Sequence, residues 1–424
     1  MRVAIVVPRY GPDVAGGAEA HARQWAERFR GTLGWEVDVY TSTARDYTTW
    51  KRAYRQGVEC VNGVVVRRFH ARFRRWPTVF GLISRVVFVL ERMARLRRCR
   101  SQRWLRGTLL VIERAWYVLQ GPYCPGLLAN LEQNADCYDR IFFFTYLYYP
   151  TVMGLGRLAV RSVLVPTAHD EPPLYFQHTR RLLQDARLIL ANTPAEADLI
   201  DRALPGSRSK TVVAGLGISL AELSAVEPSA RHNSAPDDPY VLYLGRVCRG
   251  KGVDRLIALF LDYCRRAGDS MTRLVLAGRS EMRMRVSRHE QVVSVGFIAE
   301  EQKVPLIRGA RCVINPSPAE SLSMVVLEAL ALGVPLLVNG HCAVLSYFAE
   351  ETETTFVYRD GDEFVRELKA ILATPWRQQP DAAARLARSQ QWVAEHYSWE
   401  RVLSTITSAL EGGAITGLRA PGPR

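Results

Sequence analysis

The sequence of 424 residues predicts two doubly wound α/β domains in one chain. Three observations predict this fold class. Short apolar stretches alternate with stretches of helical periodicity, as expected for strands and helices that alternate along the chain. A glycine loop follows the first strand of each half, at residues 16–17 and 245–252. A polar, proline-rich segment, 227–239, lies between the halves and is predicted to be the linker.

The first half opens with a strand, a loop and a helix. Residues 2–7 are apolar, residues 8–17 form a loop that ends in Gly16 and Gly17, and residues 18–30 carry apolar side chains at helical spacing. A second strand is predicted at 36–41. Strand, glycine loop, helix and strand are the opening of a doubly wound fold. The glycine pair would let the backbone approach a ligand closely, and a plain tight turn is the alternative.

A histidine follows a later strand of this half. Strands are predicted at 140–146, 162–167, 188–192 and 211–214, and His169 comes just after the second of them. A side chain at the carboxyl end of a parallel strand points into the crevice where such sheets bind ligands. His169 is therefore a candidate site residue, with a structural role as the alternative.

The second half opens with a basic glycine loop. A strand is predicted at 240–244, the loop runs from Gly245 to Gly252, and a helix begins at Val253. Arg246 and Lys251 would stand at the start of that helix, where anions are favoured. The spacing does not fit a Walker A loop. Phosphate binding is the better interpretation, and a plain surface loop is the alternative.

Two glutamates lie within a predicted strand, loop, helix and strand unit at 312–338. Glu320 precedes a helix predicted from Ser321 to Gly333, and Glu328 follows eight residues later. Eight helical residues rise about 12 Å, so the carboxylates would hold two ends of an extended ligand. Ser321, Leu322, Ser323 and Met324 would offer backbone N–H groups to a phosphate between them. The alternative is a helix-start acid and a solvated glutamate.

The remaining expected elements follow the same α/β pattern. The strands are 273–277, 292–295, 335–338 and 355–358, and the helices are 362–372, 385–397 and 398–412.

A basic segment interrupts the first half. The net charge of the chain is +14, and residues 67–114 hold fourteen arginines and two glutamates. Helices with arginines on one face and Trp, Phe and Leu on another lie in membrane interfaces. The alternatives are a helical cap with solvated arginines, or nucleic-acid binding, which no accompanying motif supports. The candidate membrane or acceptor residues are Arg72, Arg74, Arg75, Trp76, Arg97, Arg98 and Trp104.

Composition restricts the class of protein. Hydrophobic residues make up 48% of the chain and charged residues 23%, which is ordinary for a globular protein. The sequence has no uninterrupted run of 18 apolar residues and no signal-peptide layout at its start. Its eight cysteines are scattered without a C-x-x-C pair, so neither a zinc site nor a disulfide framework is expected. We expect a cytoplasmic protein that is peripheral on the inner face of a membrane.

The chain resembles retaining glycosyltransferases of the GT-B fold, family 4. The motifs that carry this resemblance are Arg246-x4-Lys251 after a strand and Glu320-x7-Glu328, supported by Gly16-Gly17, His169 and Ser398-Trp399-Glu400. The resemblance implies two Rossmann-like domains facing a cleft. These domains would span 1–230, with a basic helical insertion at 66–123, and 237–397. A helix at 398–412 would cross back to the first domain, and 413–424 would be a flexible tail.

The resemblance also implies roles for single residues. Gly245, Arg246 and Lys251 would bind the donor diphosphate, Glu320 the donor sugar and Glu328 the ribose. Gly296 and Phe297 would flank the base, while Gly16-Gly17 and His169 would lie near the phosphates and the reacting carbon. No metal and no cofactor is implied. Residues 339–345 depart from the glycine-rich turn and glutamate of many relatives, so the base and the sugar stay open.

The function implied is polysaccharide biosynthesis by sugar transfer. A nucleotide-sugar donor would give its sugar to a lipid-linked or cell-surface glycan. A nucleotide-sugar epimerase of the same fold and a non-catalytic sugar-nucleotide or nucleic-acid binder are the alternatives. We expect no nucleic-acid partner.

Overall fold

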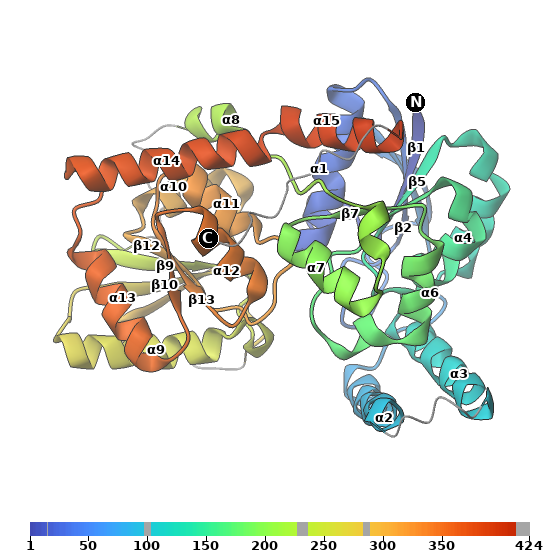
Figure 1. Ribbon diagram of the computed structural model, residues 1–424, viewed down its shortest axis with the longest axis horizontal. Coiled ribbons are helices and arrows are strands. Elements are labelled where there is room, and N and C mark those ends of the chain that lie inside the picture. Colours follow the sequence, from blue (N-terminus) through green and yellow to red (C-terminus); the bar gives the residue numbers. More distant parts are fainter. Residues whose placement is uncertain (15, 97–102, 227–235, 283–288, 413–424) are drawn as a thin grey trace. The chain divides into compact units, whose positions relative to one another are not determined.

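A computed structural model describes the chain except for residues 15, 97–102, 227–235, 283–288 and 413–424 (Figure 1). Contacts divide the chain into two compact units, Met1–Gly215 with Thr405–Arg424, and Leu216–Ser404. The boundary lies before the expected residue 230, because Ile218 N donates to Tyr397 O at 2.6 Å and so joins the end of the second unit. Most of the predicted linker and the predicted tail fall outside the described residues.

The N-terminal unit is built on an eight-stranded sheet with the order β3-β4-β2-β1-β5-β6-β7-β8. Neighbouring strands are parallel except for the antiparallel pair β3 and β4. The strands are β1 (Arg2–Val6), β2 (Glu36–Ser42), β3 (Gly57–Val61), β4 (Val64–Phe69), β5 (Arg140–Phe144), β6 (Ser162–Val165), β7 (Leu188–Ala191) and β8 (Thr211–Val213).

Helices and short 3-10 turns cover this sheet. The helices are α1 (Gly17–Gly31), α2 (Pro77–Leu96), α3 (Arg103–Gln120), α4 (Pro125–Gln133), α5 (Tyr149–Gly154), α6 (Gln177–Asp185) and α7 (Pro194–Ala203). The 3-10 turns are η1 (Ala135–Cys137), η2 (Leu155–Arg161), η3 (Pro172–Tyr175) and η4 (Ser207–Lys210).

The C-terminal unit is built on a six-stranded parallel sheet with the order β11-β10-β9-β12-β13-β14. Its strands are β9 (Tyr240–Leu244), β10 (Arg273–Ala277), β11 (Val292–Gly296), β12 (Cys312–Asn315), β13 (Leu336–Asn339) and β14 (Thr355–Tyr358). Its helical elements are α8 (Leu220–Ser224), η5 (Arg249–Lys251), α9 (Val253–Ala267), α10 (Glu300–Gly309), α11 (Met324–Ala331), α12 (Ala343–Glu351), α13 (Gly361–Ala373) and α14 (Pro380–Tyr397). α15 (Trp399–Leu410) begins in this unit, and its residues from Thr405 belong to the N-terminal unit.

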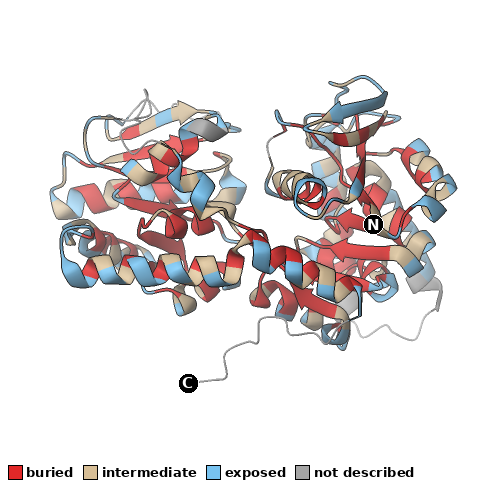
Figure 2. Cartoon of the chain, turned by 90° about the horizontal axis from the view of Figure 1, so that it is seen from above, coloured by how far each residue is buried: buried red, intermediate tan, exposed pale blue. Residues whose placement is uncertain are grey.

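The central strands of both sheets are buried, whereas the edge strand β3 is exposed (Figure 2). Strands such as β5 and β6 are apolar on both faces because helices cover both faces of a parallel sheet. The fold is therefore the predicted pair of doubly wound α/β domains.

The structure corrects three expectations about the elements. The hairpin of β3 and β4 was not predicted, and β4 includes residues 66–69 of the expected helical insertion. The helix after Glu320 begins at Met324 rather than near Ser321, because Ser323 has a left-handed backbone, with φ of 69°. That helix ends at Ala331 with Leu332 as its C-cap, and Gly333 follows with a left-handed backbone, φ 63°, which confirms the glycine expected at the helix C-terminus.

The two helices of the basic segment, α2 and α3, project together from the N-terminal unit (Figure 1). Their inner faces pack through Val87, Trp116 and Tyr117 against Phe176. The indole N–H of Trp116 also donates to Ser84 Oγ at 2.9 Å. Among the described residues, no helix has the length and apolar content needed to cross a membrane.

Glu113 of α3 caps the N-terminus of α6. Its carboxylate accepts the backbone N–H groups of Gln177 and His178, each at 2.9 Å, and lies 2.9 Å from His178 Nδ1. Burial alone would raise the pKa of Glu113, but the bonds from His178 and the backbone lower it. A carboxylate suits a helix N-terminus because the first N–H groups lack intrahelical partners.

Candidate functional site

Hydrogen bonds to β9 and β10 fix the shape of the basic loop after β9. Tyr243 donates its hydroxyl to Arg246 O at 2.7 Å, and burial raises the pKa of this phenol. Gly245 N donates to Ala277 O of β10, and Gly278 passes so close to Gly245 that a Cβ there would collide with the backbone. The predicted Arg246 is about one-third exposed, with its Nη1 4.0 Å from Glu281 Oε1.

Lys251 ends the turn η5 and meets Glu320. Its Nζ lies 2.7 Å from Glu320 Oε1 and 3.5 Å from Ser317 Oγ. Lys251 follows β9 and Glu320 follows β12, and these neighbouring strands lie where the strand order reverses. Such a topological switch point is where open α/β sheets bind ligands. The structure thus brings together two residues that the sequence places 69 positions apart.

The loop from Pro316 to Ser323 is fixed by short polar contacts. Asn315 donates its amide to Ser323 Oγ at 2.9 Å and accepts from Ser317 N at 3.0 Å. Asn339 of β13 donates to Pro316 O at 3.2 Å. These asparagines were not predicted as site residues, although both end a strand at the ligand-binding edge of the sheet.

Gly252 is required by the approach of this loop. It has a φ of 72°, and a Cβ there would lie 2.6 Å from Pro316 O. The basic loop and the Glu320 loop are therefore in direct backbone contact.

Glu328 lies on α11 in a buried ion pair. Its Oε1 contacts Lys303 Nζ of α10, and the two side chains are 9% and 10% exposed. Lys303 could not be predicted as a site residue, because a single lysine on a helix has no distinctive spacing. Glu328 is thus not the solvated residue of the alternative interpretation.

The other predicted donor residues lie at the same edge of the sheet. Ser321, Leu322 and Ser323 precede α11, and Met324 is its first residue. Gly296 ends β11 with a φ of 73°, and the neighbouring Phe297 is 67% exposed. An exposed aromatic ring at this edge offers a flat apolar surface.

In the N-terminal unit, Gly16 lies against a buried ion pair. Arg9 donates its Nε and Nη2 to Glu19 Oε1, at 2.9 and 2.6 Å. A Cβ at Gly16 would collide with Glu19, whereas one at Gly17 would meet open space. Of the predicted glycine pair, Gly16 carries the steric requirement. Arg9 and Glu19 were missed, because neither stands in a recognisable motif.

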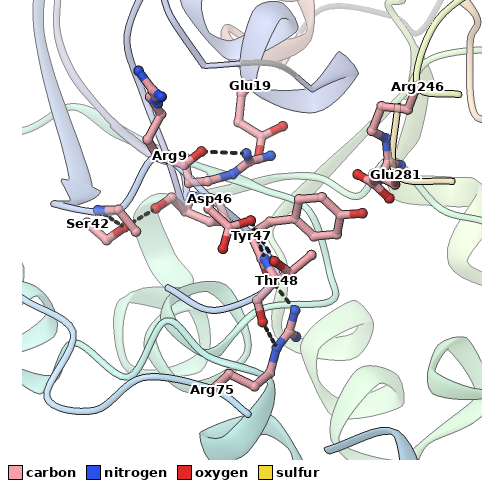
Figure 3. A network of polar contacts seen from close by, with 12 residues as sticks. Arg9, Glu19, Ser42, Asp46, Tyr47, Thr48, Arg75, Arg246 and Glu281 are labelled. Atoms are coloured by element: carbon pink, nitrogen blue, oxygen red, sulfur yellow. Dashed lines mark hydrogen bonds and ion pairs between the residues drawn. The ribbon is translucent and has the colours of Figure 1, made fainter. Parts of the chain in front are cut away.

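A polar network runs from this ion pair to the base of α2 (Figure 3). Arg9 donates its Nη1 to Arg45 O at 3.0 Å, and Asp46 then caps the turn by accepting Thr48 N at 3.0 Å. Arg75 donates its Nε to Thr48 O at 2.7 Å and also contacts Tyr47 O. Burial lowers the pKa of Arg75. This arginine, predicted to face a membrane or acceptor, thus also secures the fold.

His169 follows β6 and is half-buried, on a loop secured by Glu196. The Glu196 carboxylate accepts the backbone N–H of Ala168 and, at 2.6 Å, that of Asn192. Burial raises the pKa of Glu196 to about 8. The Thr193 cap of α7 accepts Glu196 N at 3.1 Å, as its capping pattern predicts.

The predicted membrane residues are divided. Arg72, Arg74 and Trp76 are exposed at the start of α2. Arg97 and Arg98 lie outside the described residues, as does the side chain of Trp104. Among the described residues, no group of three or more His, Cys, Asp or Glu side chains is placed to hold a metal ion.

Solved structures place this architecture in a known class. The protein resembles the Anabaena Alr3699/HepE structure in complex with UDP and glucose, with a TM-score of 0.66 and 16% identity, over 97% of this chain and all of that one. It also resembles sucrose-phosphate synthase from Thermosynechococcus elongatus, with a TM-score of 0.64 and 19% identity, over 97% and 98% of the two chains. The protein has the GT-B fold of glycosyltransferases.

One family model matches part of the chain. Residues 227–390 match the model of the family Glycosyl transferases group 1. The match lies within the C-terminal unit and covers less than half of the chain.

Individual relatives match the chain at low sequence identity. The chain is 25% identical over 215 residues to a GDP-mannose-dependent alpha-(1-6)-phosphatidylinositol dimannoside mannosyltransferase of Mycobacterium tuberculosis. That match covers 49% of this chain and 54% of the relative, about half of each. The D-inositol 3-phosphate glycosyltransferase 1 of Catenulispora acidiphila is 25% identical over 437 residues, covering 95% and 93% of the two chains.

Proposed function

We propose that this protein transfers a sugar from a nucleoside-diphosphate sugar to an acceptor hydroxyl, with retention of the anomeric configuration. The observation that carries the proposal is the Lys251–Glu320 pair at the switch point of the C-terminal sheet. The Lys251 cation suits the phosphates of a nucleoside-diphosphate sugar. The Glu320 carboxylate beside it can accept hydrogen bonds from the sugar hydroxyls. The match of residues 227–390 to the family Glycosyl transferases group 1 supports the same reaction.

The proposed donor contacts follow the order of the strands. Arg246 and Lys251 bind the diphosphate, and the backbone N–H groups of Leu322, Ser323 and Met324 complete its cradle. Glu320 binds sugar hydroxyls. In the donor complex, the diphosphate joins or replaces Glu320 as the anionic partner of Lys251.

The nucleoside end has two proposed contacts. Glu328 accepts hydrogen bonds from the ribose hydroxyls, and Lys303 orients its carboxylate. Phe297 stacks on the base. The names of the relatives include GDP-mannose and UDP, so both bases are candidates for this chain.

The proposed chemical step exchanges one C–O bond for another. The bond between the anomeric carbon and the diphosphate oxygen breaks, and the acceptor oxygen bonds to the same face of the sugar. The leaving phosphate oxygen takes the acceptor proton. Negative charge builds on the diphosphate, where Arg246, Lys251 and the backbone N–H groups stabilise it, so the proposal requires no metal ion. His169 of the N-terminal unit assists near the reacting carbon.

The proposed acceptor is a lipid-linked or cell-surface glycan, reached by a cytoplasmic enzyme peripheral on the membrane. One relative is named for a phosphatidylinositol dimannoside, which supports a lipid-linked acceptor. A nucleotide-sugar epimerase is the nearest competing function, and it would form its product without an acceptor.

Donor binding is the first test. The purified full chain is heated with UDP-, GDP- or ADP-sugars, and the donor is expected to raise the melting temperature, because a ligand that binds the folded form stabilises it. The alanine variant K251A is expected to lose this shift, whereas K369A, at an exposed lysine of α13, keeps it. No shift with any sugar nucleotide, or an equal shift for K251A, would contradict the proposal.

A further inference from the structure

We propose that the outer face of α2 and an arginine-lined pocket at its base form one docking surface for an anionic phospholipid membrane. The α2 outer face consists of Val79, Leu82, Val86, Val89, Leu90 and Met93. This inference deepens the proposed function and rests on its membrane-bound acceptor, because it assigns the residues and the lipid class that hold the enzyme there.

The α2 outer face is a continuous apolar stripe. Its members are spaced three, four, three, one and three residues apart, which places them on one side of a helix. Leu82 is 64% exposed, and the other members are between 40% and 56% exposed. Scattered exposed apolar residues are normal, but six on one helix face indicate a surface that contacts something apolar.

The stripe is separate from the face that attaches α2 to the protein. Ser84, Val87 and Glu91 are buried against α3 and its surroundings, so the packing of the hairpin does not use the stripe. Arg85 and Arg92 are exposed and lie seven residues apart on the remaining side of the helix. At about 100° per residue, they border the stripe on the side away from the packed face.

This three-sided layout is that of an interfacial helix. The apolar side enters the acyl boundary, and the long arginine side chains extend to the phosphates. Between residues 70 and 93 the acidic residue is Glu91, which is buried, so this stretch presents no exposed carboxylate to an anionic surface.

Aromatic residues continue the stripe at the start of α2. Trp76, immediately before Pro77, is 71% exposed, and Phe73 is 38% exposed and stacked on Tyr123. Tryptophan concentrates at the boundary between headgroups and acyl chains because its ring is apolar and its N–H is polar.

A basic pocket lies at the same end of the helix. It has a volume of about 280 Å³ and is lined by Trp50, Arg52, Ala71, Arg72, Phe73 and Arg74. Guanidinium groups bind phosphate through paired hydrogen bonds. The pocket is anchored on both sides, because the indole N–H of Trp50 donates to Gln120 O at 2.6 Å and the backbone N–H of Arg72 donates to Tyr123 O at 2.9 Å.

The pocket and the stripe favour one partner together. A phosphate group alone would explain the arginines but not the six apolar side chains. An apolar protein partner would explain the stripe but not the cluster of Arg52, Arg72 and Arg74. An anionic phospholipid has both parts, a phosphate headgroup beside an acyl chain.

The first experiment measures co-sedimentation of the full chain with vesicles of phosphatidylcholine alone or mixed with phosphatidylglycerol. The triple variant L82E/V86E/V89E is expected to bind mixed vesicles at least about 10-fold more weakly than wild type, because each glutamate opposes both insertion and anionic lipid. The control V58E/V160E/M271E adds the same charge at positions 62%, 76% and 57% exposed elsewhere and is expected to bind like wild type.

A second pair of variants separates the pocket from general charge. R72Q/R74Q is expected to weaken binding to mixed vesicles by about 10- to 30-fold, at about 5-fold per arginine. R187Q/R202Q removes two exposed arginines elsewhere and is expected to have a small effect. Inorganic phosphate at millimolar concentration should not release the wild type from vesicles, because it lacks the acyl chain that the stripe contacts.

A spectroscopic readout places the surface in the bilayer. Brominated lipids are expected to quench part of the tryptophan fluorescence of vesicle-bound wild type, and W76F is expected to lose that part. Unchanged quenching in W76F, or equal vesicle binding by L82E/V86E/V89E and its control, would overturn the proposal.

Other binding partners of this surface would give different experimental results. A self-association in sedimentation velocity that the triple variant abolishes, with vesicle binding unchanged, would identify a second copy of the chain instead. Binding to oligonucleotides that exceeds binding to vesicles would identify nucleic acid instead. Donor-induced thermal shifts, measured on the same variants without vesicles, test the proposed transfer separately. A variant that keeps this shift and loses vesicle binding supports the docking surface.

Discussion

Lys251 and Glu320 meet across the switch point of the C-terminal sheet, 2.7 Å apart, although each belongs to the loop of a different strand. Their side chains are 23% and 14% exposed, so the pair is open enough to exchange partners with a ligand. Ion pairs near a surface contribute about 0–1 kcal/mol to stability. Loss of the pair is therefore expected to change the free energy of unfolding little, so a role in ligand binding can be tested separately from a role in folding.

The first prediction separates these two roles. K251A and E320A are expected to lower transfer by at least about 100-fold, since each removes a contact to charge or to a hydroxyl in the reacting sugar. Their urea unfolding free energies are expected to fall by less than about 1 kcal/mol. Turnover with the donor found in the thermal screen, measured beside urea titrations, checks both halves. Near-normal turnover in either variant would contradict the assignment.

Two neighbouring glycines provide a matched test of the loop contact. G252A is expected to destabilise the C-terminal unit by about 1–3 kcal/mol and to weaken donor binding, because its Cβ would press on Pro316 O at a positive φ. G250A is the control, since a Cβ there would meet Cys248 Sγ at 4.0 Å. Equal unfolding midpoints for both variants would show that the close approach of the two loops does not contribute to stability.

The buried pair of Glu328 and Lys303 gives a test of ribose binding. E328Q keeps the shape of the side chain and is expected to raise KM for the donor about 10-fold while kcat changes little, since the ribose does not react. K303M, which removes the partner, is expected to raise KM in the same direction. Initial rates over a range of donor concentrations measure the effect. A loss confined to kcat would assign Glu328 to the chemical step.

Stability in acid depends on His21 of α1. This residue is buried between Trp25 and Phe144, and burial lowers its pKa from 6.5 to about 3. Between those values the unfolded chain binds a proton that the folded chain does not, so stability falls as pH falls from about 6.5. The contribution approaches about 1.4 kcal/mol per pH unit.

The variant H21Q keeps an N–H donor and does not titrate. Its loss of stability between pH 7.5 and pH 5 is expected to be smaller than that of wild type, and the exposed control H289Q is expected to behave like wild type. Urea unfolding followed by tryptophan fluorescence at both pH values gives the comparison. Glu196 titrates with the opposite sign, because its pKa is raised to about 8, and the difference between variants removes its effect.

Metal dependence is the fifth prediction. Because Arg246, Lys251 and backbone N–H groups are proposed to carry the charge of the leaving diphosphate, transfer is expected to persist within about 2-fold in excess EDTA. A loss of activity that Mg²⁺ or Mn²⁺ restores would require a different account of the leaving group.

Much of this protein could be predicted from sequence. Strands β9, β10, β12 and β14 are apolar runs flanked by polar, glycine or proline residues, and their bounds agree with the prediction. Lys251 and Glu320 could be named as candidate site residues because both stand in spaced motifs after strands, but their contact with each other was not predicted. The N-terminal hairpin of β3 and β4 was missed, because its β3 residues are exposed and lack a buried alternation.

Partners that depend on tertiary contact could not be predicted. Lys303, Arg9 and Glu19 carry no motif, and their pairing is decided by which helices the fold brings together. The same is true of Arg67 and Arg68, which were counted with the basic segment. Arg68 is in fact buried and paired with Glu59, and Arg67 is paired with Asp38.

The cap that Glu113 places on α6 makes the hairpin of α2 and α3 inseparable from its host. Excision of residues 77–120 would leave the first turn of α6 with unmet N–H groups and would uncover Phe176. The hairpin is therefore part of the folded N-terminal unit. A variant that lacks it is expected to unfold locally around α6, in addition to losing membrane binding. Changes confined to its outward side chains are the way to release the protein while keeping it whole.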